Sequence, residues 1–110
     1  MKIHLVKAAT LENFALSNAQ SRGAIEEWLD KLKHANWEQP ADIKKTYHAA
    51  DFLGKSSHKI IFDLGGNKYR LICKYAFGAK QIHLYICWIG THAAYSKLNG
   101  QLMQYTTNNY

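Results

Sequence analysis

The sequence predicts a small α+β protein with helices in its first half and strands in its second half. In the first half, apolar residues recur at three- and four-residue spacing, the period of a helix with one buried face. In the second half, apolar and polar residues alternate in runs separated by glycine-rich turns, as in strands. A length of 110 residues fits one domain and excludes a full dinucleotide-binding sheet. A hydrophobic fraction of 47% excludes wholesale disorder.

Three elements are predicted in the first 33 residues. Residues 3–6 form a short apolar strand. Thr10 is placed to cap a first helix, and after a break at residues 18–23 a clearer second helix follows. The apolar faces of the two helices are Leu11, Phe14 and Ala15 in the first, and Ile25, Trp28, Leu29 and Leu32 in the second. Such stripes are typical of core packing.

Residues 36–57 give a weaker pattern. Pro40 suits the first turn of a short helix over residues 40–44. A connection of this length without local structure is uncommon in a compact domain. The favoured interpretation is a solvated, mildly basic connection.

A three-stranded antiparallel meander is predicted next. Residues 60–64 form its first strand, and Gly65, Gly66 and Asn67 form a tight reversal because these residues accept a positive φ. Residues 68–77 form the return strand. After a turn at 78–80, residues 81–89 form the third strand.

Alternation along the return strand places three cations on one face. Lys68, Arg70 and Lys74 share this face with Ile72. The ordinary interpretation is an exposed strand face, and the alternative is an anion-binding site. Asp63 is the one acid in residues 58–110 that could pair with these cations.

The positive charge is concentrated in the second half. The whole chain has 14 Lys+Arg and 8 Asp+Glu, a net charge of +6. Residues 1–57 hold eight basic and seven acidic residues, whereas residues 58–110 hold six basic residues and one acid, together with six of the seven tyrosines. This pattern suggests nucleic acid, an anionic membrane surface or an acidic protein as partner, although charge for solubility alone also accounts for it. Basic residues interleaved with aromatics favour nucleic acid.

A helix beginning near Thr91 is predicted after the third strand. His92 and Tyr95 lie three residues apart in its first turn, with Leu98 and Leu102 on the same stripe as Tyr95. Both could be packing residues. As functional groups, His92 suits proton transfer, and Tyr95 suits proton donation or base stacking.

No cofactor or metal is expected. The six histidines lack the spacing of a metal site, and Cys73 and Cys87 lie in apolar runs that predict buried free thiols. No apolar run is long enough to span a membrane, so a cytoplasmic protein without membrane association is expected.

Three segments resemble the HigB-type toxins of bacterial type II toxin–antitoxin systems. They are Ile61 to Ile72 (IFDLGGNKYRLI), Ile89 to Lys97 (IGTHAAYSK) and Trp37 to Lys44 (WEQPADIK). The first two, in this order and spacing, are fairly specific. The resemblance extends from the first helix to about residue 98.

The resemblance implies a RelE-like fold, with two N-terminal helices packed on a small twisted antiparallel sheet and a short C-terminal helix. It implies a single toxin domain over residues 1–110, with 106–110 as a frayed tail. It further implies a metal-independent mRNA endoribonuclease (an mRNA interferase) that acts on the ribosome and inhibits translation. A HigA-type helix-turn-helix antitoxin would neutralise it, and a toxin–antitoxin heterotetramer is one possible assembly of the two proteins.

Candidate site residues follow from cleavage by 2′-hydroxyl attack. Arg70, His92 and Tyr95 are the candidate catalytic residues, because a guanidinium stabilises phosphoryl charge and histidine transfers protons. The candidate RNA-binding residues are Asn67, Lys68, Lys74 and Lys97.

Ser96 and Asn99 depart from the family, which commonly has acids at these positions. The exchange at Ser96 would reduce activity if the acid orients His92 or the substrate, and would be harmless if it only caps the helix. A non-catalytic RNA-binding module, or a degenerate toxin that binds antitoxin without cleaving RNA, remains the alternative.

Overall fold

The structure of the protein is a computed structural model that describes residues 1–54 and 57–100. The predicted frayed tail at 106–110 and the apolar position Leu102 lie outside the described residues. The elements in chain order are β1 (Lys2–Val6), α1 (Ala9–Ser17), a 3-10 turn (Ala19–Ser21), α2 (Arg22–Lys33), a second 3-10 turn (Pro40–Asp42), α3 (Ile43–Thr46), β2 (Asp51–Phe52), β3 (Lys59–Leu64), β4 (Tyr69–Phe77), β5 (Gln81–Thr91) and α4 (His92–Gly100). The predicted mixture of helices and strands is confirmed.

One five-stranded sheet organises these elements, in the order β1-β5-β4-β3-β2. The predicted meander forms β3, β4 and β5, which pair antiparallel. The expectation of an antiparallel sheet is wrong at one edge, because β1 pairs parallel with β5. The chain leaves β1, crosses the helical face and enters the sheet at the far side, which leaves the edge of β5 open for β1.

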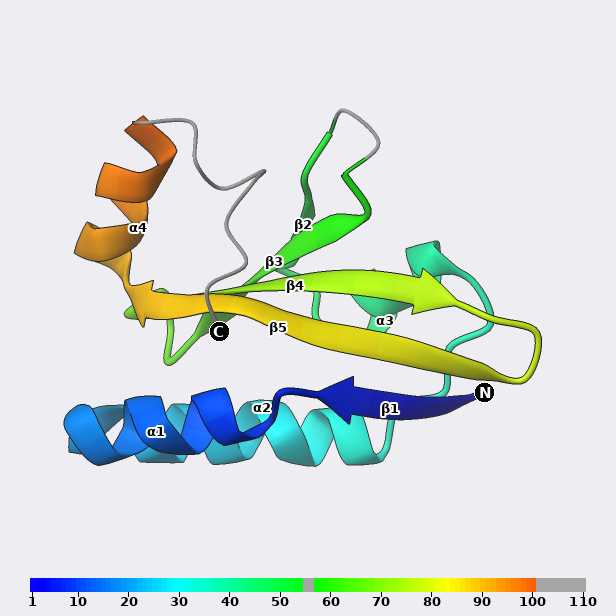
Figure 1. The fold of residues 1–110 in the computed structure, drawn as a ribbon, viewed down its shortest axis with the longest axis horizontal. Coiled ribbons are helices and arrows are strands. Elements are labelled where there is room, and N and C mark those ends of the chain that lie inside the picture. Colours follow the sequence, from blue (N-terminus) through cyan, green and yellow to red (C-terminus); the bar gives the residue numbers. More distant parts are fainter. Residues whose placement is uncertain (55–56, 101–110) are drawn as a thin grey trace.

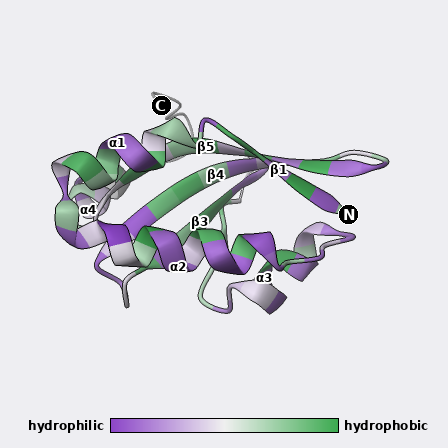
Figure 2. Ribbon diagram, turned by 90° about the horizontal axis from the view of Figure 1, so that it is seen from below, coloured by the Kyte–Doolittle hydropathy of each residue, from purple (hydrophilic) through white to green (hydrophobic). Residues whose placement is uncertain are grey.

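The sheet separates two faces of different character. α1 and α2 lie side by side against one face, and α4 lies on the other (Figure 1). Hydrophobic and hydrophilic residues alternate along α2, as expected for a helix with one buried stripe (Figure 2). We call the face toward α1 and α2 the helical face and the opposite one the outer face.

The helical face holds the main core, and the predicted apolar stripes supply much of it. Leu11, Ala15, Ile25, Trp28 and Leu32 are all buried there. Thr10 is not the cap of α1, since the helix begins at Ala9 with Ala8 before it and has no side-chain cap.

The segment expected to be a solvated connection contributes to the same core. Trp37, Ile43, Tyr47 and Ala50 are each at most 8% exposed. The short helix predicted at Pro40 is present and anchors this segment. Three charged residues between these apolar positions, Glu38, Lys44 and Lys45, are exposed, and they hid the apolar pattern.

The hairpin between β3 and β4 confirms the predicted reversal. Gly65, Gly66 and Asn67 all have positive φ, between 62° and 79°. Close packing against α2 also favours glycine at position 65, because a Cβ there would lie 3.2 Å from the Cβ of Ala24. Lys68 belongs to this turn and not to β4, which begins at Tyr69.

A bulge in β5 changes which side chains face outward. Ile72 pairs with Trp88 but Cys73 pairs with Ile86, so Cys87 is an additional residue. Ile86 and Ile89 therefore face the main core, while Cys87 and Trp88 both join a second cluster on the outer face. Ile61, Ile72, Leu53, Tyr95 and Leu98 complete this outer cluster.

Both cysteines are free and buried, as predicted. Burial raises the pKa of the Cys73 thiol well above its ordinary value, and it also raises the pKa of Cys87. Neither thiol is therefore suited to act as a nucleophile. No helix within the described ranges is long and apolar enough to cross a membrane.

Replacing Tyr47 by Phe tests the anchor of residues 37–50. The Tyr47 hydroxyl donates a buried 2.7 Å hydrogen bond to the carbonyl oxygen of Trp28, and the two rings are stacked. Tyr47→Phe keeps the ring and loses the bond, so we expect the free energy of unfolding to fall by about 1 kcal/mol. Urea denaturation measures this. Tyr75→Phe is the matched control, and an equal loss in both variants would contradict the assignment.

Asp42 gives stability a defined pH dependence. Its carboxylate accepts hydrogen bonds from the backbone N–H groups of Glu38 and Gln39 and pairs with Lys45. The Glu38 bond first, and then Lys45, hold the pKa of Asp42 below its ordinary value. A depressed pKa stabilises the fold above the unfolded-state pKa, and this stabilisation is lost as the pH falls through the folded-state value.

We therefore expect Asp42→Asn to be less stable than the parent at pH 7 and to approach it below about pH 4. Thermal unfolding of both proteins between pH 3 and pH 7 measures the difference. A difference that stays constant over this range would show that the charge of Asp42 has no part in it.

Candidate functional site

The candidate site lies on the outer face, at the end of the sheet where β5 leads into α4. The alternation predicted for β4 is confirmed, because Leu71 and Cys73 pack in the main core while Ile72 packs in the outer cluster. Arg70 and Lys74 lie on the same side as Ile72. Of these two cations, Arg70 is nearer to α4, because it pairs with Gly90 close to the end of β5.

The Arg70 guanidinium is held by two side chains from the β3–β4 hairpin. Its Nε lies 2.9 Å from Oδ1 of Asp63, the residue directly opposite on β3. The Nε–H bond does not point along this line, so the contact is an ion pair rather than a well-directed hydrogen bond. Its Nη2 donates a 2.9 Å hydrogen bond to Oδ1 of Asn67. Asp63, the acid that the sequence singled out, therefore does pair with one of the cations.

The guanidinium remains accessible despite these contacts. The Arg70 side chain is 18% exposed and that of Asp63 is 24% exposed. A guanidinium has five N–H donors. The Nε of Arg70 is buried beside Asp63, and one N–H of Nη2 is donated to Asn67 on the exposed side of the side chain. Further donors of Arg70 can therefore reach an incoming anion.

Tyr95 covers Arg70 from α4. The Arg70 Cζ lies 5.2 Å from the centroid of the Tyr95 ring, within cation–π range. The Trp88 ring also lies beside Tyr95, with ring centroids 6.2 Å apart and the two planes tilted by 57°. The predicted convergence of Arg70 with Tyr95 is thus present, with Tyr95 packed against the outer cluster at the same time.

A backbone hydrogen bond fixes the position of His92. Its backbone N–H donates a 3.0 Å hydrogen bond to the carbonyl oxygen of Lys68, and its side chain is partly exposed at the first residue of α4. The Ala94 N–H donates to Oγ1 of Thr91. Both of these backbone N–H groups are therefore already hydrogen-bonded. The first turn of α4 offers an anion fewer free N–H donors than a helix start normally does.

The remaining predicted residues lie on the same hairpin, strand and helix. Lys68 is exposed in the hairpin turn, Lys74 is exposed four residues beyond Arg70 on β4, and Lys97 is exposed on α4. Ser96, where the family commonly has an acid, is exposed next to Tyr95. Asn67, expected to contact RNA, accepts a hydrogen bond from Arg70.

The sequence did not reveal the contact between Trp88 and Gly90 beside the candidate site. A Cβ at Gly90 would lie 2.5 Å from Cη2 of Trp88, so the indole rests directly on the Gly90 backbone. A glycine inside a strand signals such a close approach. The bulge hid the role of Trp88, since strict alternation would place this side chain in the main core.

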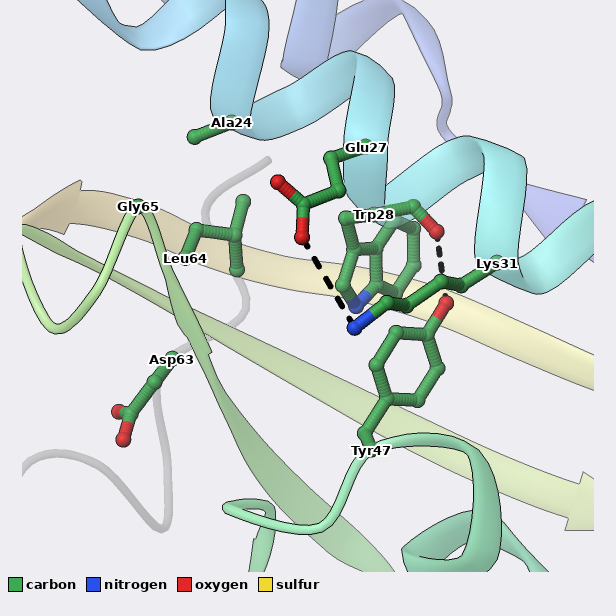
Figure 3. A pocket seen from close by; sticks show the side chains of 8 residues that line it. All are labelled: Ala24, Glu27, Trp28, Lys31, Tyr47, Asp63, Leu64 and Gly65. Atoms are coloured by element: carbon green, nitrogen blue, oxygen red, sulfur yellow. Dashed lines mark hydrogen bonds and ion pairs between the residues drawn. The ribbon is translucent and has the colours of Figure 1, made fainter.

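A small hollow lies on the helical face, between α2 and the end of β3. It has a volume of about 40 Å³, and Trp28, Tyr47, Glu27 and Lys31 lie along it. Asp63 borders it, but its carboxylate is turned away from the other side chains (Figure 3). The space suits about one water molecule and is too small for a nucleotide.

Metal-ligating side chains do not gather at either place. Within residues 1–54 and 57–100, no group of three or more His, Cys, Asp or Glu residues could hold a metal ion. The structure brings the Arg70 guanidinium and the Tyr95 ring together, and His92 lies at the start of the same helix as Tyr95. A guanidinium beside an aromatic ring suits an anionic ligand with planar groups.

Gly90→Ala tests the contact that seats Trp88. A methyl group would push the indole away from β5, and we expect the free energy of unfolding to fall by about 1–3 kcal/mol. The physical cause is the clash with Trp88, so the same substitution in a Trp88→Ala background is expected to have a much smaller effect. Denaturation of the four proteins measures this coupling, and additive effects would refute it.

Comparison with known families agrees with this architecture. The family profile of the HigB toxin, described as the RelE-like toxic component of a toxin–antitoxin system, matches residues 21–98. This range covers α2, the whole β3–β5 meander and most of α4, and therefore all of the candidate site. Comparison with curated proteins finds no match. The chain therefore belongs to the HigB family of RelE-like toxins of toxin–antitoxin systems.

Proposed function

We propose that this toxin is an mRNA endoribonuclease whose site is the outer-face group around Arg70. The observation that carries the proposal is a guanidinium held in place by Asp63 and Asn67, covered by Tyr95 and still accessible. A cation fixed before its ligand arrives stabilises developing negative charge without further reorganisation. RNA supplies such a charge at its phosphates.

The proposed reaction needs no metal ion. The 2′-oxygen of the RNA forms a bond to the adjacent phosphorus, and the bond from phosphorus to the 5′-oxygen breaks. The products are a 2′,3′-cyclic phosphate and a free 5′-hydroxyl. One proton leaves the 2′-hydroxyl and one joins the 5′-oxygen, so proton transfer is required at both positions.

The site residues divide these tasks among them. Arg70 stabilises the charge on the phosphoryl oxygens, and His92 transfers protons. Tyr95 holds the guanidinium by its ring and offers a face to a base. Lys68, Lys74 and Lys97 attract the flanking backbone. For Asn67 we propose a positioning role through its hydrogen bond to Arg70, in place of direct RNA contact.

The partners follow from the family. A toxin of this kind works with an antitoxin, and we propose a HigA-type helix-turn-helix protein that neutralises it. We also propose that the RNA substrate is mRNA, encountered on the ribosome, and that cleavage inhibits translation. Covering of the Arg70 site by the antitoxin would block cleavage directly.

Substitution of the three central residues tests the proposal. Arg70→Ala and His92→Ala are expected to lower the cleavage rate about 100-fold or more, because each removes a group that acts in the transition state. Both are also expected to relieve growth arrest after induction. Tyr95→Phe keeps the ring over Arg70 and is expected to retain most cleavage, whereas a proton-donor role would make it inactive. Reverse-transcription stops on cellular mRNA measure cleavage.

Lys33→Ala, at the end of α2 on the helical face, is the control for loss of a positive charge. Its cleavage should equal that of the parent. Parental cleavage by Arg70→Ala would refute the assignment of the site. A parent protein that binds RNA and antitoxin, but produces no stops, would instead identify the degenerate toxin that Ser96 leaves as the alternative.

A further inference from the structure

The outer face continues beyond the Arg70 site as a strip of rings beside lysines. The outward-facing side chains of β5 include His83 and Tyr85, and the bulge adds Trp88 to the same side. The His83 and Tyr85 rings are nearly parallel, with centroids 6.0 Å apart and an interplanar angle of 30°. The strip therefore runs along one strand, from its exposed beginning to the site.

A histidine on the neighbouring strand widens this strip. His4 of β1 is paired with His83 in register, and their rings meet edge to face at 5.5 Å. His4 is exposed, while His83 and Tyr85 are partly exposed. The six histidines gave no metal spacing in the sequence, yet the fold brings two of them together with a tyrosine.

The charges in the same rows are positive. Lys74 lies directly opposite Tyr85, and Lys2 lies opposite Gln81. The three cross-strand rows at this end, through Gln81, His83 and Tyr85, contain no acidic residue. Asp51 and Asp63 are the acids in strands of this face, and both lie in rows nearer to α4. Along β4, Lys74 is about 13 Å from Arg70, at four residues of strand rise.

We propose that His4, His83 and Tyr85, flanked by Lys2 and Lys74, form a binding platform for single-stranded RNA that extends the Arg70 site. The chemistry follows from the juxtaposition. Aromatic rings stack bases without sequence preference, and lysines beside them attract the phosphates of the same strand. RNA bound at Arg70 continues along β4 and β5, with its backbone on Lys74 and its bases on Tyr85 and His83. This assignment rests on RNA being the ligand of the Arg70 site.

The test compares two lengths of an RNA that cannot be cleaved. Fluorescently labelled 2′-O-methyl RNA lacks the attacking hydroxyl, so binding is measured without reaction. A trinucleotide is short enough to occupy the Arg70 site alone, whereas an octanucleotide can also reach the platform. Each is titrated with the full-length parent protein and its variants by fluorescence anisotropy at fixed salt concentration, because phosphate contacts depend on salt.

Tyr85→Ser is expected to weaken binding of the octanucleotide about 10-fold and to leave the trinucleotide unchanged. His83→Ser is expected to act in the same direction. Tyr85→Phe is the matched control, since it keeps the ring, and it should bind both RNAs as the parent does. Circular dichroism confirms that each variant is folded.

Several outcomes would overturn the platform. The first is an unchanged affinity of Tyr85→Ser for the octanucleotide, and the second is an equal loss for both lengths. The third is a parent that binds the octanucleotide no more tightly than the trinucleotide. Loss of antitoxin binding by Tyr85→Ser, with RNA binding intact, would make this face a protein interface instead.

The two proposals fail separately. If the parent cleaves mRNA while Tyr85→Ser binds RNA normally, the platform is wrong and the proposed function stands. If the parent does not cleave mRNA, but the length-dependent loss is seen, the platform stands on a protein that binds RNA without cutting it.

Discussion

Burial of Ile72 on the outer face is the constraint on which the rest of this structure depends. The central strand β4 has apolar side chains on both faces, and Ile72 is fully buried on the side away from α1 and α2. An apolar side chain in that position needs a cover, because the hydrophobic effect disfavours its contact with water. Tyr95 and Leu98 of α4, together with Trp88, supply the cover. Packing a helix there for stability also brings its first turn to Arg70.

The elements of the fold were predictable where the local pattern was regular. The stripes of α1 and α2, the hairpin at Gly65–Asn67 and the three strands of the meander follow from spacing alone. The parallel pairing of β1 with β5 was not predictable, because periodicity says nothing about which edge a strand joins. Burial of Trp37, Ile43 and Tyr47 was hidden by exposed charged residues such as Glu38 and Lys44. One additional residue in β5 turns Trp88 and Ile89 to the faces opposite to those that strict alternation gives.

The site was predictable as a surface and less so as a set of contacts. Alternation on β4 correctly placed Arg70 and Lys74 on one face, and helical spacing placed Tyr95 near the same end of the sheet. The contact of Arg70 with Asp63 depends on strand register, which the sequence left open. Nothing in the sequence indicated that the Asn67 side chain would accept a hydrogen bond from Arg70. A guanidinium held by an acid is well oriented, but a bound phosphate must share it with a negative neighbour.

The hydrogen bond from the His92 N–H to the Lys68 carbonyl oxygen joins the β3–β4 hairpin to the start of α4, and these two segments carry most of the candidate site. Because only main-chain atoms take part, the bond is indifferent to which side chains stand at these two positions, and only proline at position 92 would remove the donor. The position of the helix relative to the hairpin is therefore independent of the side chains that stand at these two positions. Side chains at this corner of the sheet can therefore be substituted while this hydrogen bond keeps the β3–β4 hairpin next to the start of α4.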